Sequence, residues 1–166
     1  MVRLATCVGF LLLFAATALA RGPEEGKPAP AIQARLLDGS QFALADQSGK
    51  VVVMNLWATW CAPCRAEMPA LEAYYQKHKA EGLELLAISL DEPKDDAKVR
   101  EVMRSFTFPA ALARDAQFKG YGRVWRLPLT FVIDRHGVLR KDRWYGTPGI
   151  DVPLLEAVVT PLLQAP

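Results

Sequence analysis

The chain has 166 residues, 51% of them hydrophobic, and its 20 Lys and Arg nearly balance its 18 Asp and Glu, leaving a net charge of +2. This balanced charge, without a run of basic residues, argues against a nucleic-acid-binding protein. The sequence also lacks a second long apolar segment, which argues against a channel. The length suits one domain with a sizeable core, and we see no internal repeat.

The first twenty residues have the pattern of an export signal. Arg3 supplies a short positive start, an uncharged apolar stretch follows, and Ala18-Leu19-Ala20 resembles a signal peptidase site. The apolar stretch is shorter than the about 20 residues of a comfortable membrane span, so we expect cleavage after Ala20. An uncleaved N-terminal anchor is the alternative. Cys7 precedes the apolar stretch, and we expect it to be removed with the leader.

Behind this leader, residues 21–30 are rich in Gly and Pro and indicate an extended linker. Residues 31–166 would then form a single domain. Two cysteines remain in it, Cys61 and Cys64, and in an exported protein a disulfide between cysteines can persist.

The first half of the domain predicts a hairpin followed by a βαβ unit. Residues 32–46 hold an Asp-Gly turn between short apolar segments, which indicates the hairpin. Residues 51–57 are a continuous β-branched and apolar run, typical of a strand covered on both faces, and residues 83–90 predict a second buried strand. Between them, from Pro63 to an exit at Gly82, apolar residues recur at helical spacing. Strands joined in this way run parallel with a right-handed crossover.

The second half predicts a helical insertion and then a ββα unit. The insertion would comprise a helix within residues 95–106 and a short second helix at residues 115–122. Residues 129–134 form a third buried strand, and a short turn pairs residues 138–146 with it antiparallel. Asp151 would cap a final helix with an apolar stripe. The order predicts an α/β fold, a mixed central sheet with helices on both faces.

Cys61-Ala62-Pro63-Cys64 lies at the carboxyl end of the first buried strand, where open α/β sheets place their sites. Haem attachment requires His directly after the second cysteine, where Arg65 stands, and a zinc site requires further ligands at short spacing. A structural disulfide and a redox centre remain as interpretations. A loop this short stabilises a fold weakly, whereas a helix N-terminus lowers a thiol pKa and favours the thiolate. We therefore favour the redox centre.

The residues around the cysteines resemble the thioredoxin family. "WATWCAPC" with Pro69 is similar to its active-site strand and kinked helix, and "RLPLTFVIDRHG" resembles the segment that carries a cis-proline opposite the cysteines. The leader, the hairpin and the helical insertion narrow the resemblance to the TlpA/ResA group of extracytoplasmic thiol-disulfide oxidoreductases. The resemblance implies a thioredoxin fold with an N-terminal hairpin and a helical insertion.

The resemblance also implies a role for each matching residue. Cys61 would be the attacking cysteine and Cys64 the resolving one, and Glu67 matches a glutamate that influences their proton exchange. The residues that would bind substrate are Trp60, Ala62, Pro63, Leu127 and Pro128. Pro128 would follow a cis peptide bond, and the Leu127 backbone would form hydrogen bonds with an extended substrate chain. The alternatives are a core aromatic at Trp60, an ordinary strand-entry proline at Pro128, and a solvated surface carboxylate at Glu67.

Two departures from the thioredoxin pattern matter. Asn55 occupies the position of thioredoxin's buried aspartate and cannot accept a proton, which directs attention to Glu67. Asparagine at this position is common in the TlpA-like group. Leu129 replaces a threonine that family members usually carry after the cis-proline, which makes the substrate-facing lip more apolar.

The implied function is an exported protein-disulfide reductase, periplasmic or otherwise extracytoplasmic, that needs no metal or organic cofactor. Its expected partners are disulfide-containing client proteins, such as apocytochrome c or the copper-site subunit of an oxidase, and a membrane protein that donates electrons. We expect a monomer. The alternatives are a disulfide-forming oxidant and a redox-inert binding or chaperone domain. A peroxidase of the peroxiredoxin type is disfavoured because Trp60 stands directly ahead of the reactive cysteine.

Overall fold

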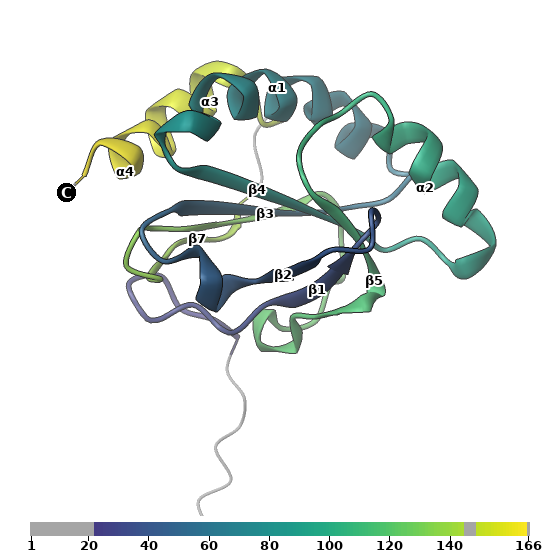
Figure 1. Cartoon of the computed structure of the whole chain (residues 1–166), viewed down its shortest axis with the longest axis horizontal. Coiled ribbons are helices and arrows are strands. Elements are labelled where there is room, and N and C mark those ends of the chain that lie inside the picture. Colours follow the sequence, from purple (N-terminus) through teal and green to yellow (C-terminus); the bar gives the residue numbers. More distant parts are fainter. Residues whose placement is uncertain (1–21, 145–148, 166) are drawn as a thin grey trace, which may run out of the picture.

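The computed structural model describes residues 22–144 and 149–165, so the predicted leader, its cleavage site and Cys7 lie outside the described residues. Seven strands form one mixed sheet in the order β2-β1-β5-β4-β3-β6-β7 (Figure 1). The strands are β1 Gln33–Leu36, β2 Gln41–Ala43, β3 Val51–Trp57, β4 Leu83–Ser89, β5 Ala110–Gln117, β6 Leu129–Ile133 and β7 Leu139–Trp144. The α-helices are α1 Ala62–His78, α2 Asp96–Met103, α3 Val152–Val158 and α4 Thr160–Gln164.

Strand β3 is an inner strand of the sheet, between β4 and β6, and is buried at every residue. It pairs parallel with β4, with Val51 opposite Leu83, and antiparallel with β6, with Leu56 opposite Leu129. The β3–α1–β4 crossover and the β1–β2 hairpin are therefore confirmed. Because β6 runs antiparallel to β3, the beginning of β6 lies beside the end of β3, where the cysteine motif follows.

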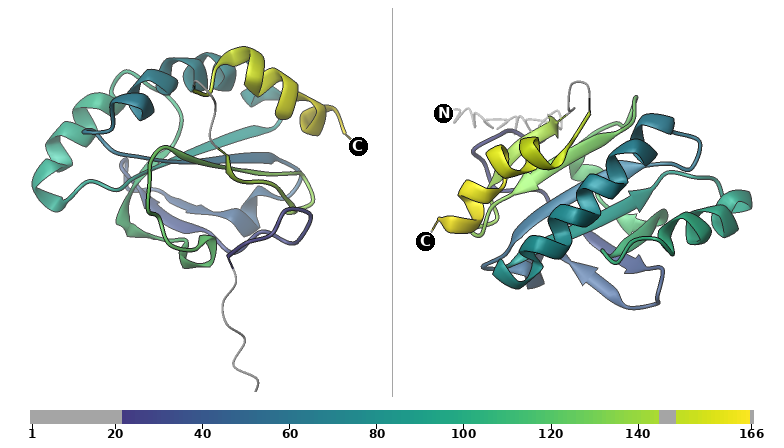
Figure 2. Two further views of the ribbon diagram at one scale, coloured as in Figure 1. Left: turned by 180° about the vertical axis from the view of Figure 1, so that it is seen from behind. Right: turned by 90° about the horizontal axis from the view of Figure 1, so that it is seen from above.

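The four α-helices of the described residues lie on one face of the sheet. Figure 2 shows α1 between α2 on one side and the α3–α4 pair on the other. On the opposite face, 3-10 helices η1 (Leu44–Gln47) and η4 (Lys119–Tyr121) contribute Leu44 and Tyr121 to a separate apolar cluster. The expected helices on both faces are thus α-helices on one face and 3-10 helices on the other.

The helical insertion between β4 and β6 differs from the prediction. Helix α2 is present, but the short second helix expected at residues 115–122 is wrong. Residues up to Gln117 belong to β5, and only η4 follows. Strand β5 pairs parallel with β4 and antiparallel with β1, and this pairing outweighs a weak local preference for helix. The insertion is therefore a helix and a strand that widens the sheet.

The C-terminal helix is divided in two. Asp151 caps α3 as predicted, since its Oδ1 accepts the Leu154 N–H at 2.8 Å. The helix stops at Val158, and α4 restarts with Pro161 in its first turn. Proline has no N–H to donate and its ring crowds the preceding turn, so the apolar stripe continues across a break in the helix.

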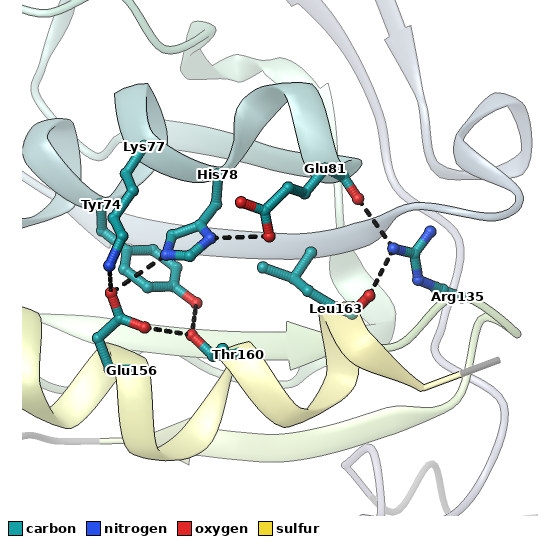
Figure 3. Close-up of polar contacts among 8 residues, drawn as sticks. All are labelled: Tyr74, Lys77, His78, Glu81, Arg135, Glu156, Thr160 and Leu163. Carbon is teal, nitrogen blue, oxygen red and sulfur yellow. Dashed lines mark hydrogen bonds and ion pairs between the residues drawn. The ribbon is translucent and has the colours of Figure 1, made fainter.

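A polar cluster fastens α3 and α4 to the C-terminal end of α1 (Figure 3). His78 is 4% exposed, and its ring nitrogens lie 3.1 Å from a carboxylate oxygen of Glu81 and 3.1 Å from one of Glu156. Lys77 Nζ lies 2.6 Å from the same Glu156 oxygen, and Thr160 donates to the other. These contacts fix the position of α3, whose N-cap Asp151 directly follows Ile150.

The segment ahead of β1 contacts the far edge of the sheet. The Gly26 N–H donates to the Leu139 carbonyl at 2.8 Å, and the Leu139 N–H donates to the Lys27 carbonyl at 2.9 Å. The described part of the predicted linker is thus hydrogen-bonded to β7. Over the described ranges, every helix is too short or too polar to cross a bilayer.

Candidate redox site

The cysteine pair occupies the junction between β3 and α1. Cys61 and Cys64 form a disulfide with their Cα atoms 5.3 Å apart. Cys61 is the N-cap of α1, and its Sγ accepts the Cys64 N–H at 3.3 Å. Pro63 stands in the first helical turn, where a missing N–H costs nothing because that group would have no partner in the helix. The Cys64 amide, which has no partner within the helix, thus points at Sγ of Cys61, where it stabilises a thiolate.

Both cysteines are buried, and Cys61 is slightly the more exposed residue of the two. Cys61 is 5% exposed and Cys64 is 1% exposed. Ala62 and Pro63, between them, are exposed. Both cysteines belong to one apolar core cluster, and the exposed Trp60 directly precedes Cys61.

Trp60 lies at the surface beside the pair. It is 68% exposed, so the alternative of a core aromatic is wrong. Together with Leu90, Trp125 and Leu127 it lines a hollow of about 390 Å³. Trp125 is 67% exposed, and these two tryptophans are the exposed large hydrophobic side chains of the described residues.

The peptide bond between Leu127 and Pro128 is cis, as the resemblance implied. Pro128 is buried directly ahead of β6, and Leu127 is half-buried against the apolar cluster that contains Cys61 and Cys64. The antiparallel pairing of β6 with β3 brings this segment to the same end of the sheet as the cysteines. The predicted cis-proline segment and the redox pair are therefore neighbours.

Glu67 is buried, at 4% exposure, so the alternative of a solvated surface carboxylate is wrong. Its Oε1 accepts the Ile150 N–H at 3.0 Å, and among the described residues its Oε2 has no hydrogen-bond partner. Burial raises the pKa of the Glu67 carboxyl, and the hydrogen bond from Ile150 opposes part of that rise. Glu67 lies one helical turn beyond Cys64, and Ile150 packs in the same cluster as the cysteines.

Comparison with known proteins agrees with this geometry. Residues 26–142 match the AhpC/TSA family. The thiol-disulfide oxidoreductase ResA of Bacillus cereus is 36% identical over 137 residues, covering 81% of this chain and 78% of the relative. The thioredoxin-like protein YneN of Bacillus subtilis is 36% identical over 129 residues, covering 76% of this chain and 74% of the relative.

The chain belongs to the AhpC/TSA family and is a ResA-like thiol-disulfide oxidoreductase. Its thioredoxin fold is confirmed by solved structures, among them a thiol:disulfide interchange protein of the thioredoxin family from Chlorobium tepidum. That structure superposes with a TM-score of 0.69 at 25% identity and covers 86% of this chain and 99% of its own.

Asn55 of this ResA-like protein is a structural residue. It is 1% exposed, and its Nδ2 donates to Thr130 Oγ1 at 3.0 Å, which links β3 to β6. A side-chain amide is neither an acid nor a base near neutral pH, so Asn55 cannot act as a proton acceptor for the cysteines. The buried carboxyl on the same helix as Cys64, α1, is that of Glu67.

Two residues of the ResA-like site have no counterpart in the sequence predictions. Trp125 stands three residues before the cis-proline, in "GRVWRLP". A large apolar residue between two arginines was the sequence signal that could have indicated an exposed binding residue. Asp91 follows β4, and nothing in its local sequence shows that it is buried. Among the residues that the structure describes, no group of three or more His, Cys, Asp or Glu is placed to hold a metal ion.

Proposed function

We propose that this ResA-like protein is an exported protein-disulfide reductase. The observation that carries the proposal is the position of Cys61 at the N-cap of α1, at the same end of the sheet as the cis-proline segment. In this proposal residues 1–20 direct export and residues 31–166 form the catalytic domain. Residues 21–30 are the linker between the two.

The proposed reaction begins with the reduced pair. The Cys61 thiolate attacks one sulfur of a client disulfide, forms a mixed disulfide and releases the other client sulfur as a thiolate. The Cys64 thiolate then attacks Cys61 Sγ, which forms the Cys61–Cys64 disulfide and releases the second client thiolate. The client gains two electrons and, after protonation, two protons. The oxidised pair must be reduced again by a dithiol donor.

Glu67 is proposed to exchange protons with this pair. The Cys64 thiol must lose its proton before it can attack, and the released client thiolates must gain protons. A buried carboxyl whose pKa is raised by desolvation can hold a proton closer to neutral pH than an exposed one. Its position one turn beyond Cys64 supports this role.

The proposed client surface surrounds the two sulfurs. An extended client segment would lie along the Leu127 backbone, which borders the start of β6, and over the hollow next to Cys61. The side chains proposed to contact it are Trp60, Ala62, Pro63, Leu127 and Pro128. The apolar lining of the hollow would favour clients with apolar side chains next to the attacked cysteine.

The proposed setting is the periplasm or another extracytoplasmic compartment, with the N-terminus either cleaved or retained as an anchor. There the protein would act as a monomer on client cysteines, for example those of apocytochrome c or of an oxidase copper-site subunit. A membrane protein that carries electrons outward would restore the dithiol.

The test of the reductase assignment is insulin reduction by purified protein with dithiothreitol as donor, compared with Cys61→Ser. We expect the wild-type protein to precipitate insulin chains faster than the donor alone, and C61S to match the donor alone. Equal rates for the two proteins would overturn the assignment. A reduction potential near that of strong oxidants would instead indicate a disulfide-forming oxidant.

A further inference from the structure

Asp91 is a buried carboxylate that the chemistry above does not use. It is 7% exposed, and none of the ion pairs of the described ranges includes it. A buried carboxylate without a cation destabilises a fold unless hydrogen bonds satisfy its oxygens. Its hydrogen-bond partners therefore indicate what it does.

The Asp91 carboxylate joins the ends of the two central parallel strands. The Thr59 N–H donates to Oδ2 at 2.9 Å, and the Thr59 hydroxyl donates to Oδ1 at 2.6 Å. On the other side, the Ser89 hydroxyl donates to Oδ2 at 2.7 Å and accepts the Asp91 N–H at 3.1 Å. Ser89 ends β4, and Thr59 lies between β3 and α1.

Thr59 belongs to the turn that leads into the redox helix. The Cys61 N–H donates to the Ala58 carbonyl at 3.1 Å, so Thr59 and Trp60 are the central residues of a four-residue turn. The last residue of this turn is Cys61, whose Sγ lies 3.3 Å from the Cys64 N–H. The orientation of the turn thus sets both the place of the nucleophile at the helix end and the exposure of Trp60.

We propose that Asp91 is a positioning residue for Cys61. It holds the turn through the backbone N–H and the hydroxyl of Thr59. Without it the turn could rotate, and Sγ of Cys61 would leave the amide that stabilises its thiolate. A displacement of about 1 Å at a reacting atom can lower a rate by about a hundredfold. The inference does not depend on the client or on the direction of electron flow.

The test is alkylation of the reduced full-length protein by iodoacetamide across a range of pH, with modified Cys61 quantified by mass spectrometry. The variants are Asp91→Ala and Asp91→Asn. Asn keeps the contacts, since its Oδ1 can accept from the Thr59 N–H and the Ser89 hydroxyl while its Nδ2 donates to Thr59 Oγ1. The charged groups around the turn, Arg65 and Glu67 on α1 and Lys98 and Glu101 on α2, are the same in all of the proteins compared.

We expect D91A to alkylate Cys61 about threefold or more slowly at pH 7, with a profile moved to higher pH, because less thiolate is present. D91N should stay within about twofold of the wild-type rate. An unchanged D91A profile, even with a lower melting temperature, would show that Asp91 is only structural. A D91N profile that moves as far as that of D91A would assign the effect to charge, and it would also overturn the proposal.

If D91A does not fold, Thr59→Val and Ser89→Ala decide the question. T59V removes the hydroxyl contact on the turn side, whereas S89A removes the contact on the strand side. Slower Cys61 alkylation is expected in T59V and not in S89A. Equal rates in these two variants would contradict positioning through the turn.

Discussion

At the scale of single residues, the proposed order of the cysteines rests on the position of Cys61 at the N-cap of α1. Cys61 caps the helix, where the Cys64 N–H favours its thiolate, so Cys64→Ser should trap mixed disulfides between Cys61 and client proteins. Cys61→Ser should trap none, and both variants should lose catalytic turnover. Non-reducing gels of cell extracts measure the trapped species. Equal trapping by the two variants would reverse or remove the assigned order.

Glu67 offers a second prediction at this scale. Burial raises the pKa of its carboxyl above the ordinary value of 4.5. Its ionisation therefore opposes folding as the pH rises above about 4.5. Glu67→Gln keeps an oxygen for the Ile150 N–H and removes the charge, so the variant should be at least as stable as the wild type at pH 8 and equally stable at pH 4. Thermal unfolding at the two pH values measures this.

The same Glu67→Gln variant tests the proposed proton exchange. A nearby negative charge disfavours the thiolate, so its removal should move the pH profile of cysteine alkylation to lower pH. The active-site cysteines of reduced wild-type and variant protein are alkylated side by side. An identical profile would leave Glu67 as a buried structural residue without a role in the chemistry.

At the scale of elements, the segment between η4 and β6 supplies one wall of the hollow beside Cys61. Truncation of an aromatic anchor at an interface typically costs more than about 1 kcal/mol, or about fivefold in affinity. Trp125→Ala should therefore lower kcat/KM for insulin by about fivefold, and Trp125→Phe should retain most of it. Reduction of a small aromatic disulfide, which needs no extended surface, should be unchanged. A loss on both substrates would indicate damage to the redox pair.

The contact between α1 and α3 gives a prediction about acid stability. Hydrogen bonds from Lys77, Thr160 and His78 lower the pKa of Glu156 from 4.5 to about 2. A depressed folded-state pKa stabilises the fold above about pH 4.5, and this contribution is lost as the pH falls toward about 2. Glu156→Gln should therefore unfold at lower urea concentration than the wild type at pH 7, with a smaller gap at pH 2.5. The same gap at both pH values would mean that the carboxylate charge does not contribute.

At the scale of the whole molecule, the direction of electron flow depends on the potential of the cysteine pair. Strong oxidants lie near about −120 mV and thioredoxin near about −270 mV. Ala62 and Pro63 between the cysteines are uncharged and resemble thioredoxin's Gly-Pro, so we expect a value nearer to thioredoxin's. Equilibration in buffers of defined dithiothreitol ratio measures it.

In cells, a pair with such a potential should be mainly reduced only while a membrane donor supplies electrons. Acid-quenched thiol labelling, with and without the candidate donor, follows this state. A pair that is fully oxidised under both conditions, with a potential near the oxidant end, would make the protein a disulfide-forming oxidant.

The sequence by itself determined the features that depend on local patterns. The buried strands within residues 51–57, 83–90 and 129–134 lie in predominantly apolar segments, and the cysteine motif after the first of them places the redox site. The Asp-Gly hairpin and the Asp151 cap follow in the same way from neighbours in the chain. Each of these signals comes from residues within a few positions of each other, where spacing fixes which side chains share a face.

The tertiary structure alone decided the features that depend on partners far apart in the sequence. Strand β5 exists because β4 and β1 offer backbone groups on both its sides, although its own sequence is only weakly apolar. Glu67 is buried because Ile150, 83 positions away, returns to its side of α1. Asp91 is likewise held by Thr59, 32 positions away. Burial and hydrogen bonding of a single polar side chain are set by such contacts, and a local pattern carries no information about them.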